Sequence, residues 1–233
     1  MIEKNIFQSW YTTNLHPIVQ SKINKMKEMN PEYNYKLFND YDMDLFVNQN
    51  FEGEISVCYN KLNIIVAKVD FWRYLVLYKY GGIYLDMDSS IEYPLKELIK
   101  NNDEAIITSE GNLKFYVQWA LIFKKEHPIL KKTIDLIVSN IKNNTYPNDI
   151  MNTTGPGVFT KAINELHMEL FKEPLKNYNN NTDITYNINN ISYRLFGIDY
   201  NKFFCFKYED HHVLYQHKKN WRDEIKEVSL LKN

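Results

Sequence analysis

Residues 81–88 read GGIYLDMD, and this stretch decides how the fold of the 233-residue chain is interpreted. The two glycines suit the left-handed backbone with which helices commonly end. The apolar residues that alternate after them predict a strand over Ile83–Asp88. Alternate side chains of a strand share a face, so Tyr84, Asp86 and Asp88 would point together into a cleft or solvent, opposite the core. The stretch therefore predicts a helix end followed by a strand that carries two acids to a polar face.

The two acids form an Asp-x-Asp pair whose chemistry depends on what lies between them. Two carboxylates on one face repel each other unless a cation is bound, and oxygen ligands of this kind suit Mg²⁺ or Mn²⁺, often completed by substrate phosphates. The alternative is a strand end whose acids are simply solvated. An isolated pair favours that alternative, so a metal site needs support from the neighbouring sequence.

Such support lies in the nearly all-apolar segment Leu62–Tyr80, which predicts a helix buried on most sides. Asp70 and Arg73 are three residues apart in it and therefore share one face. Burial of an ion is costly, and a paired charge in a core often adds no net stability. We therefore expect this pair to face a polar cavity beside the acidic strand. A purely structural ion pair is the alternative.

The remaining elements predict an α/β sheet. Lys4–Trp10 reads as a strand, Val19–Met29 has the apolar spacing of a helix, and Tyr33–Phe38 reads as a second strand. This order favours a sheet of the nucleotide-binding type. The Asn-rich segment Asn177–Asn190 predicts a surface loop. With no internal repeat or linker, we expect residues 1–233 to form a single domain.

Five motifs follow one another along the chain. They are Asn5–Trp10, Asn30-Pro31-x-Tyr33, Ala67-x-x-Asp70-x-x-Arg73-Tyr74, Tyr80–Asp88 and Thr154–Gly157. In this order they resemble the motifs of DXD-containing glycosyltransferases related to yeast initiating mannosyltransferases and capsular polysaccharide transferases, and they are distantly similar to clostridial glucosylating toxins. The resemblance implies one glycosyltransferase catalytic domain of the GT-A fold, with a mixed central sheet flanked by helices.

The resemblance also implies roles for the acidic and basic residues. Asp88 would coordinate a divalent metal, Mn²⁺ or Mg²⁺, directly. Asp86 would contact that metal directly or through water, and would also contact the ribose or sugar of the donor. Asp70 and Arg73 would hold sugar hydroxyls. These four residues form the expected catalytic group.

Five further positions would bind the donor. Tyr84 would line its pocket, and Trp10 would stack on the nucleobase, with core packing as the alternative for this tryptophan. Phe7 and Gln8 stand where relatives have Ile-His, so the supporting role of that histidine is absent or is taken by Gln8. Trp221 belongs to a segment similar to the closing His…Ser-Trp element of the family.

A third metal ligand would come from a C-terminal histidine. Val213–His217 reads as a strand with His217 at its end. The match is imperfect, because Asn220 replaces the usual Ser and the spacing is shortened. His211 and His212 are rival candidates.

Composition excludes some classes of partner. The 28 basic and 29 acidic residues create no global field for nucleic acid or an anionic membrane. No segment approaches the length of a transmembrane helix, and the first ten residues lack the pattern of a secretion signal. Cys58 and Cys205 suggest buried free thiols, although a single disulfide stays open. We expect a cytoplasmic protein, and peripheral association with a membrane is left open.

The resemblance implies a retaining transferase that moves a sugar from a UDP- or GDP-sugar to a glycan, lipid-linked or protein acceptor. Phosphoryl or nucleotidyl transfer also uses Asp-x-Asp and Mg²⁺, but the chain has no Gly-x-x-x-x-Gly-Lys loop and Asp70 and Arg73 would go unused. A non-catalytic subunit that only binds sugar nucleotides is the other alternative.

Overall fold

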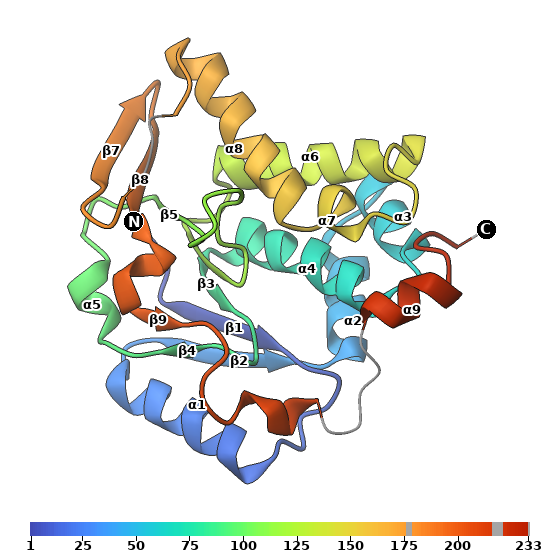
Figure 1. Cartoon of the computed structure of the whole chain (residues 1–233), viewed down its shortest axis with the longest axis horizontal. Helices are drawn as coiled ribbons and strands as arrows, with labels where there is room; N and C mark the ends of the chain where they lie inside the picture. The colour runs from blue at the N-terminus through green and yellow to red at the C-terminus, as the bar shows by residue number, and fades with distance from the viewer. Residues whose placement is uncertain (176–178, 216–220, 233) are drawn as a thin grey trace.

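The computed structural model describes residues 1–175, 179–215 and 221–232, without the side chain of Trp221. Its centre is a mixed seven-stranded sheet in the order β2-β1-β3-β6-β5-β8-β7 (Figure 1). The strands of this sheet are β1 (Asn5–Ser9), β2 (Asn34–Phe38), β3 (Gly82–Leu85), β5 (Ala105–Ser109), β6 (Ala120–Phe123), β7 (Asp183–Ile188) and β8 (Ile191–Ile198). The short strands β4 (Ser90–Ile91) and β9 (Phe204–Cys205) pair separately.

Helices cover both faces of the sheet, as expected for a GT-A fold (Figure 1). One layer contains α2 (Asp40–Asn50), α3 (Glu54–Lys61), α4 (Ile65–Tyr80), α6 (Pro128–Asn143), α7 (Ile150–Thr153) and α8 (Pro156–Phe171). The opposite layer contains α1 (Pro17–Met29) and α5 (Leu95–Leu98), followed by the 3₁₀ turns Asp199–Lys202 and His211–Leu214. The C-terminal α9 (Trp221–Glu227) is followed by Leu231, which bridges to Leu62 between α3 and α4. Each face therefore has its own hydrophobic core.

The strand directions bring several chain segments to one edge of the sheet. β1 and β3 are parallel, and β6 is antiparallel to both β3 and β5. The carboxyl ends of β1, β3 and β5 and the start of β6 therefore meet at the same edge. Open α/β sheets bind ligands at this kind of edge.

The double glycine between α4 and β3 is needed for unusual backbone angles and for a close approach to β1. Gly81 has φ +63° and Gly82 has φ +115°, a region that residues with side chains rarely adopt. A Cβ atom at Gly82 would lie 2.5 Å from the carbonyl oxygen of Asn5 on the neighbouring β1. The glycines thus let the chain leave α4 and enter the sheet directly beside β1.

The structure corrects three local predictions. β3 ends at Leu85, so Asp86 and Asp88 lie in the turn that follows, because the amide of Ser89 bonds back to the carbonyl of Asp86. Part of the Asn-rich segment forms β7, whose pairing with β8 supplies hydrogen bonds that composition does not reveal. Val213 and Leu214, expected to start a strand, belong instead to the 3₁₀ turn His211–Leu214, because amides of this segment bond three residues back.

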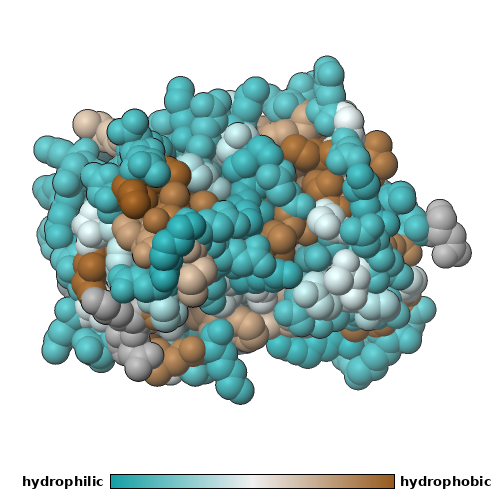
Figure 2. Space-filling view, turned by 90° about the horizontal axis from the view of Figure 1, so that it is seen from above, coloured by the Kyte–Doolittle hydropathy of each residue, from teal (hydrophilic) through white to brown (hydrophobic). Residues whose placement is uncertain are grey.

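The surface is mostly hydrophilic on the face shown in Figure 2, where apolar residues gather in separate patches. None of the helices in the described ranges is both long and apolar enough to cross a membrane. Cys58 is buried and Cys205 is half-buried, and both are free thiols. The expectation of burial was therefore correct for Cys58 and too strong for Cys205.

Candidate active site

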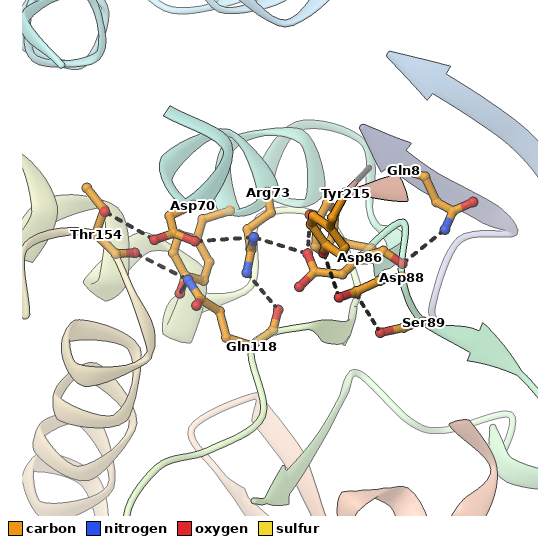
Figure 3. A network of polar contacts seen from close by, with 11 residues as sticks. Gln8, Asp70, Arg73, Asp86, Asp88, Ser89, Gln118, Thr154 and Tyr215 are labelled. Atoms are coloured by element: carbon orange, nitrogen blue, oxygen red, sulfur yellow. Dashed lines mark hydrogen bonds and ion pairs between the residues drawn. The ribbon is translucent and has the colours of Figure 1, made fainter. Parts of the chain in front are cut away.

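Arg73 lies at the centre of a buried polar network on the sheet-facing side of α4 (Figure 3). Its Nη2 atom is 3.2 Å from Asp70 Oδ1 and 3.1 Å from Asp86 Oδ1. Only 4% of Arg73 and 6% of Asp70 are exposed, so water screens these pairs weakly. One guanidinium thus joins the charged face of α4 to the turn after β3.

Neutral side chains hold Asp86 in place. The hydroxyl of Tyr84 donates to Asp86 Oδ1 over 2.6 Å, and the Tyr84 ring lies under the Arg73 guanidinium at 4.7 Å. Gln8 donates from Nε2 to the Asp86 carbonyl at 3.1 Å. Its Oε1 atom accepts from the hydroxyl of Tyr35. The last residues of β1 and β3 therefore position the Asp86 backbone and carboxylate together.

A second set of contacts closes the network on the Asp70 side. Thr154, at the start of the α8 segment, donates from its hydroxyl to Asp70 Oδ2 at 3.3 Å. The carbonyl of Gln118 accepts from Arg73 Nη1 at 3.2 Å. Gln118 Nε2 in turn donates to Tyr74 and to the carbonyl of Thr154. The segment before β6 is thereby attached to both α4 and α8.

Asp88 has a different set of partners from Asp86. Tyr215 donates its hydroxyl to Asp88 Oδ2 over 2.8 Å, and Ser89 donates to Asp88 Oδ1 at 3.4 Å. The Trp10 ring packs edge-on against Tyr215, with ring centres 6.1 Å apart. A C-terminal residue therefore reaches the acidic turn and contacts the end of β1 as well.

Burial changes the acidity of two carboxyls. Desolvation raises the pKa of Asp70 to about 6, although Arg73 opposes the shift. Desolvation also raises the pKa of Asp86 to about 6, with Arg73 again opposing it and the charge of Asp88 adding to it. The Nε atom of Arg73 is buried without a hydrogen-bond partner among the described residues. Three carboxylates and one guanidinium give the ionised network a net negative charge that favours a cation.

Comparison with known proteins agrees with this geometry. Residues 17–105 match the family described as the glycosyltransferase sugar-binding region containing a DXD motif. This segment contains α4 and the turn with Asp86 and Asp88. The chain belongs to the DXD-containing glycosyltransferases. Asp86-Met87-Asp88 is an Asp-x-Asp triplet within the matched residues, and we call it the DXD motif and its turn the DXD turn.

Two relatives and one solved structure describe the similarity. The initiation-specific alpha-1,6-mannosyltransferase of Candida albicans is 25% identical over 211 residues, which cover 73% of this chain and 54% of the relative. An uncharacterized glycosyltransferase of Acanthamoeba polyphaga mimivirus is 30% identical over 186 residues, covering 71% and 66%. The structure of the PaToxG glycosyltransferase aligns with a TM-score of 0.54 at 21% identity, covering 71% of this chain and 69% of that one. The fold is thus a glycosyltransferase fold, and the chain spans about half the length of the first curated relatives it matches.

The DXD motif fits a cation of the type that completes its shell with substrate phosphates. Within the described residues, no cluster of three or more His, Cys, Asp or Glu side chains could hold a metal by itself. Mg²⁺ is usually held by one or two carboxylates together with substrate phosphates, which matches a site with only Asp86 and Asp88. Tyr84 and Arg73 both engage Oδ1 of Asp86, and no bond from the described residues reaches its Oδ2 atom. Among the described residues, no hydrogen bond or ion pair competes with a cation for this oxygen.

The other expected site residues have varied positions in the structure. Phe7 is a core residue, 1% exposed and packed against Phe38 and Tyr80, so burial removes it from any donor pocket. Tyr84 is also buried, and it orients Asp86 instead of lining a cleft. Trp10 is half-buried beside Tyr215.

The histidine candidates give no third ligand within the described ranges. His211 bonds to the carbonyl of Tyr208, and His212 is exposed, and neither joins a three-residue cluster with the DXD acids. His217 lies outside the described residues. Trp221 starts α9, and its side chain is not described.

Three network residues were missed by the sequence interpretation. Gln118 lies in Val117–Phe123, whose sequence predicts a strand, and no role was expected for it, although a polar residue within an apolar run was a usable signal. Thr154 appeared only as part of the Thr-Gly-Pro motif. Tyr215 was included in the expected late strand with no role, and nothing in its local sequence marks it as a partner of Asp88.

Proposed function

We propose that this chain transfers a hexose from a UDP- or GDP-sugar to an acceptor hydroxyl, with retention of anomeric configuration, and uses Mn²⁺ or Mg²⁺ held by Asp86 and Asp88. The observation that carries the proposal is the joining of the DXD turn to the Asp70–Arg73 pair by a 3.1 Å ion pair. This ion pair supports a site in which the proposed cation-binding pair lies beside the proposed sugar-binding pair. The family match and the sheet edge support it.

Each proposed role follows from the contacts of the residue. Asp88 and Asp86 hold the cation, with His217, outside the described residues, as a proposed third ligand. The Nη atoms of Arg73 contact Asp70, Asp86 and the carbonyl of Gln118, and its buried Nε atom has no partner among the described residues. Arg73 and Asp70 hold sugar hydroxyls. Trp10, half-buried beside Tyr215, stacks on the nucleobase. Trp221, whose side chain is not described, is a further proposed donor-binding residue.

The chemistry separates an anionic nucleoside diphosphate from a sugar that gains positive charge. A divalent cation bound at the DXD motif supplies Lewis-acid stabilisation of the leaving diphosphate. The protein's own contribution is positioning. Arg73 and Tyr84 keep Asp86 in one orientation, and the buried network excludes water from the side of the sugar away from solvent.

Retention is what the resemblance to the family implies, and no carboxylate nucleophile is assigned in this chain. Asp70 and Asp86 are both paired with Arg73, which lowers their nucleophilicity. We therefore favour substitution on one face of the sugar, in which the leaving diphosphate accepts the proton of the acceptor hydroxyl. A trapped sugar adduct on an Asp or Glu would overturn this step.

A donor screen tests the proposal. Wild-type protein is incubated with a panel of UDP- and GDP-hexoses and Mn²⁺, and sugar release and thermal shift are scored together. Mannose donors belong in the panel because the relatives are named mannosyltransferases. Metal-dependent release of free sugar supports the proposal. Release of phosphate or nucleoside monophosphate instead indicates the phosphoryl- or nucleotidyl-transfer alternative, and binding without turnover indicates a non-catalytic subunit.

The proposed acceptor is a hydroxyl of a glycan, a lipid-linked glycan or a protein. The free thiols at Cys58 and Cys205 support a reducing compartment such as the cytoplasm.

A further inference from the structure

A pocket of about 460 Å³ lies between the β5–β6 connection and α8. Its size falls within the roughly 300–1,000 Å³ of small-ligand sites. Its walls include Ser109, Phe115, Tyr116, Thr160, Asn164 and Leu175. None of these residues belongs to the DXD network, and none is among the residues proposed to bind the donor.

Two chain segments connect this pocket to the catalytic centre. Tyr116 in the wall is two residues before Gln118, whose carbonyl accepts from Arg73, so about 7 Å of extended chain separates them. Thr160 is six residues after Thr154, which bonds to Asp70, and six helical residues span about 9 Å. Both paths start from the two sides of the Asp70–Arg73 pair. The wall residues Tyr116 and Thr160 are therefore each within about 10 Å of chain from a residue that bonds to that pair.

The pocket wall is braced, because its two sides are bonded to each other. The amide of Tyr116 donates to the Thr160 hydroxyl at 3.0 Å, and the Tyr116 hydroxyl reaches Asn164 Oδ1 at 3.5 Å. Thr160 and Asn164 are four residues apart and so lie on one face of α8. A wall of this kind is preorganised, which lowers the cost of ordering it around a ligand.

The chemistry of the wall suits a neutral ring with one apolar face and polar edges. Phe115 is half-buried and Leu175 is partly buried, so both offer apolar surface. The Thr160 hydroxyl and the Asn164 amide can still donate hydrogen bonds to a ligand. Among the described lining residues, Lys114 is the one charged side chain and is exposed, and none is acidic. This composition favours neither a metal ion nor a polyanion.

We infer that this pocket binds the terminal pyranose of a neutral glycan acceptor and presents its hydroxyl to the centre formed by Asp70, Arg73 and the DXD motif. The C–H face of the ring packs on Phe115, and its hydroxyls bond to Thr160 and Asn164. The inference rests on the proposed glycosyl transfer. It adds the substrate class and the residues that select it.

The test separates acceptor use from donor cleavage. Wild type, Asn164→Ala and Phe115→Ala are assayed with a sugar nucleotide that wild type hydrolyses, in the absence and presence of methyl glycosides of mannose, glucose and galactose. Transfer to one of these glycosides is expected for wild type. Each variant should raise the acceptor KM by about three- to tenfold, the factor expected for one lost polar or stacking contact, and leave donor hydrolysis within about twofold.

Two controls exclude a structural effect. Lys161→Ala alters an exposed residue of α8 that does not line the pocket, and it should leave the acceptor KM unchanged. Phe115→Tyr keeps the aromatic face and should restore most of the wild-type KM.

The outcomes are distinguishable. Transfer that is unaffected by the pocket variants, donor hydrolysis that falls with them, or wild-type hydrolysis without transfer to any of the glycosides would overturn the acceptor pocket while leaving the proposed function in place. Absence of donor hydrolysis in wild type with every sugar nucleotide would overturn the proposed function itself, and the pocket inference with it.

Discussion

Arg73 Nη2 lies 3.1 Å from Asp86 Oδ1, so the middle of α4 is tied directly to the DXD turn. The same nitrogen lies 3.2 Å from Asp70 Oδ1. A single guanidinium therefore neutralises part of the charge of two buried carboxylates. Stability and site geometry depend on the same residue, and this coupling leads to the first prediction.

Arg73→Ala should destabilise the protein by about 3–5 kcal/mol, because two buried carboxylates lose their cationic partner. Urea unfolding followed by circular dichroism measures the change. Lys131→Ala, which removes an exposed ion pair with Asp135, is the matched control and should have little effect. An Arg73→Ala variant as stable as the control would show that the network does not depend on the guanidinium.

Asp88→Ala should lower metal-dependent donor turnover by about 10²–10³-fold, the scale of a lost electrostatic contact in a transition state. The fold should be retained, because the contacts of Asp88 are with side chains at the edge of the site. Sugar release with Mn²⁺ and far-ultraviolet circular dichroism check both points. Wild-type turnover by the variant in a chelator would refute the metal assignment.

Tyr215→Phe should tighten Mn²⁺ binding by a small factor, about two- to tenfold. The Tyr215 hydroxyl donates to Asp88 Oδ2, and a cation at this oxygen has to compete with it. Titration calorimetry with Mn²⁺ alone gives the comparison, and Tyr11→Phe, at an exposed residue near Trp10, serves as control. Weaker Mn²⁺ binding by Tyr215→Phe would mean that the hydroxyl supports the liganding carboxylate.

Buried His127 should make the free energy of unfolding fall in mild acid. Its Nδ1 atom accepts from the amide of Ile129 at the start of α6, and its Nε2 atom contacts the carbonyl of Ser192. Burial lowers the pKa of His127 to about 4 from 6.5. Between these values the unfolded chain binds a proton that the folded protein does not, so stability is complete above pH 6.5 and falls toward pH 4, by about 3 kcal/mol.

The pKa values of Asp70 and Asp86 are raised to about 6, so these carboxyls bind protons more readily in the folded protein. Their protonation therefore stabilises the folded protein as the pH falls through the same range, opposite to the effect of His127. The comparison must therefore be made between wild type and His127→Asn, which keeps a side chain able to cap α6. The difference in unfolding free energy between the two proteins should change with pH from 6.5 to 4. A constant difference across this range would contradict a neutral, buried His127.

Local pattern predicted the elements whose signal lies within a few residues. α4 was recognisable because nearly every position is apolar, and its end was recognisable from Gly81-Gly82. The start of the helix was placed too early. Leu62 instead bridges to Leu231, a residue near the far end of the chain, and this pairing has no local signature. The end of β3 was placed too late for a similar reason. The turn at Asp86 leads into β4, and β4 pairs with β9, which is distant in the sequence.

The amino-acid sequence by itself determined the DXD acids, the Asp70/Arg73 spacing and the family, because helix and strand periodicity relate residues only a few positions apart. Tertiary structure alone decided which distant side chains complete the network. Gln118, Thr154 and Tyr215 reach their partners across 45, 84 and 127 residues, respectively. It also decided that Phe7 is core and that Tyr84 supports Asp86. Contacts over such separations depend on how the sheet and helices pack around a common core, and periodicity carries no information about that packing.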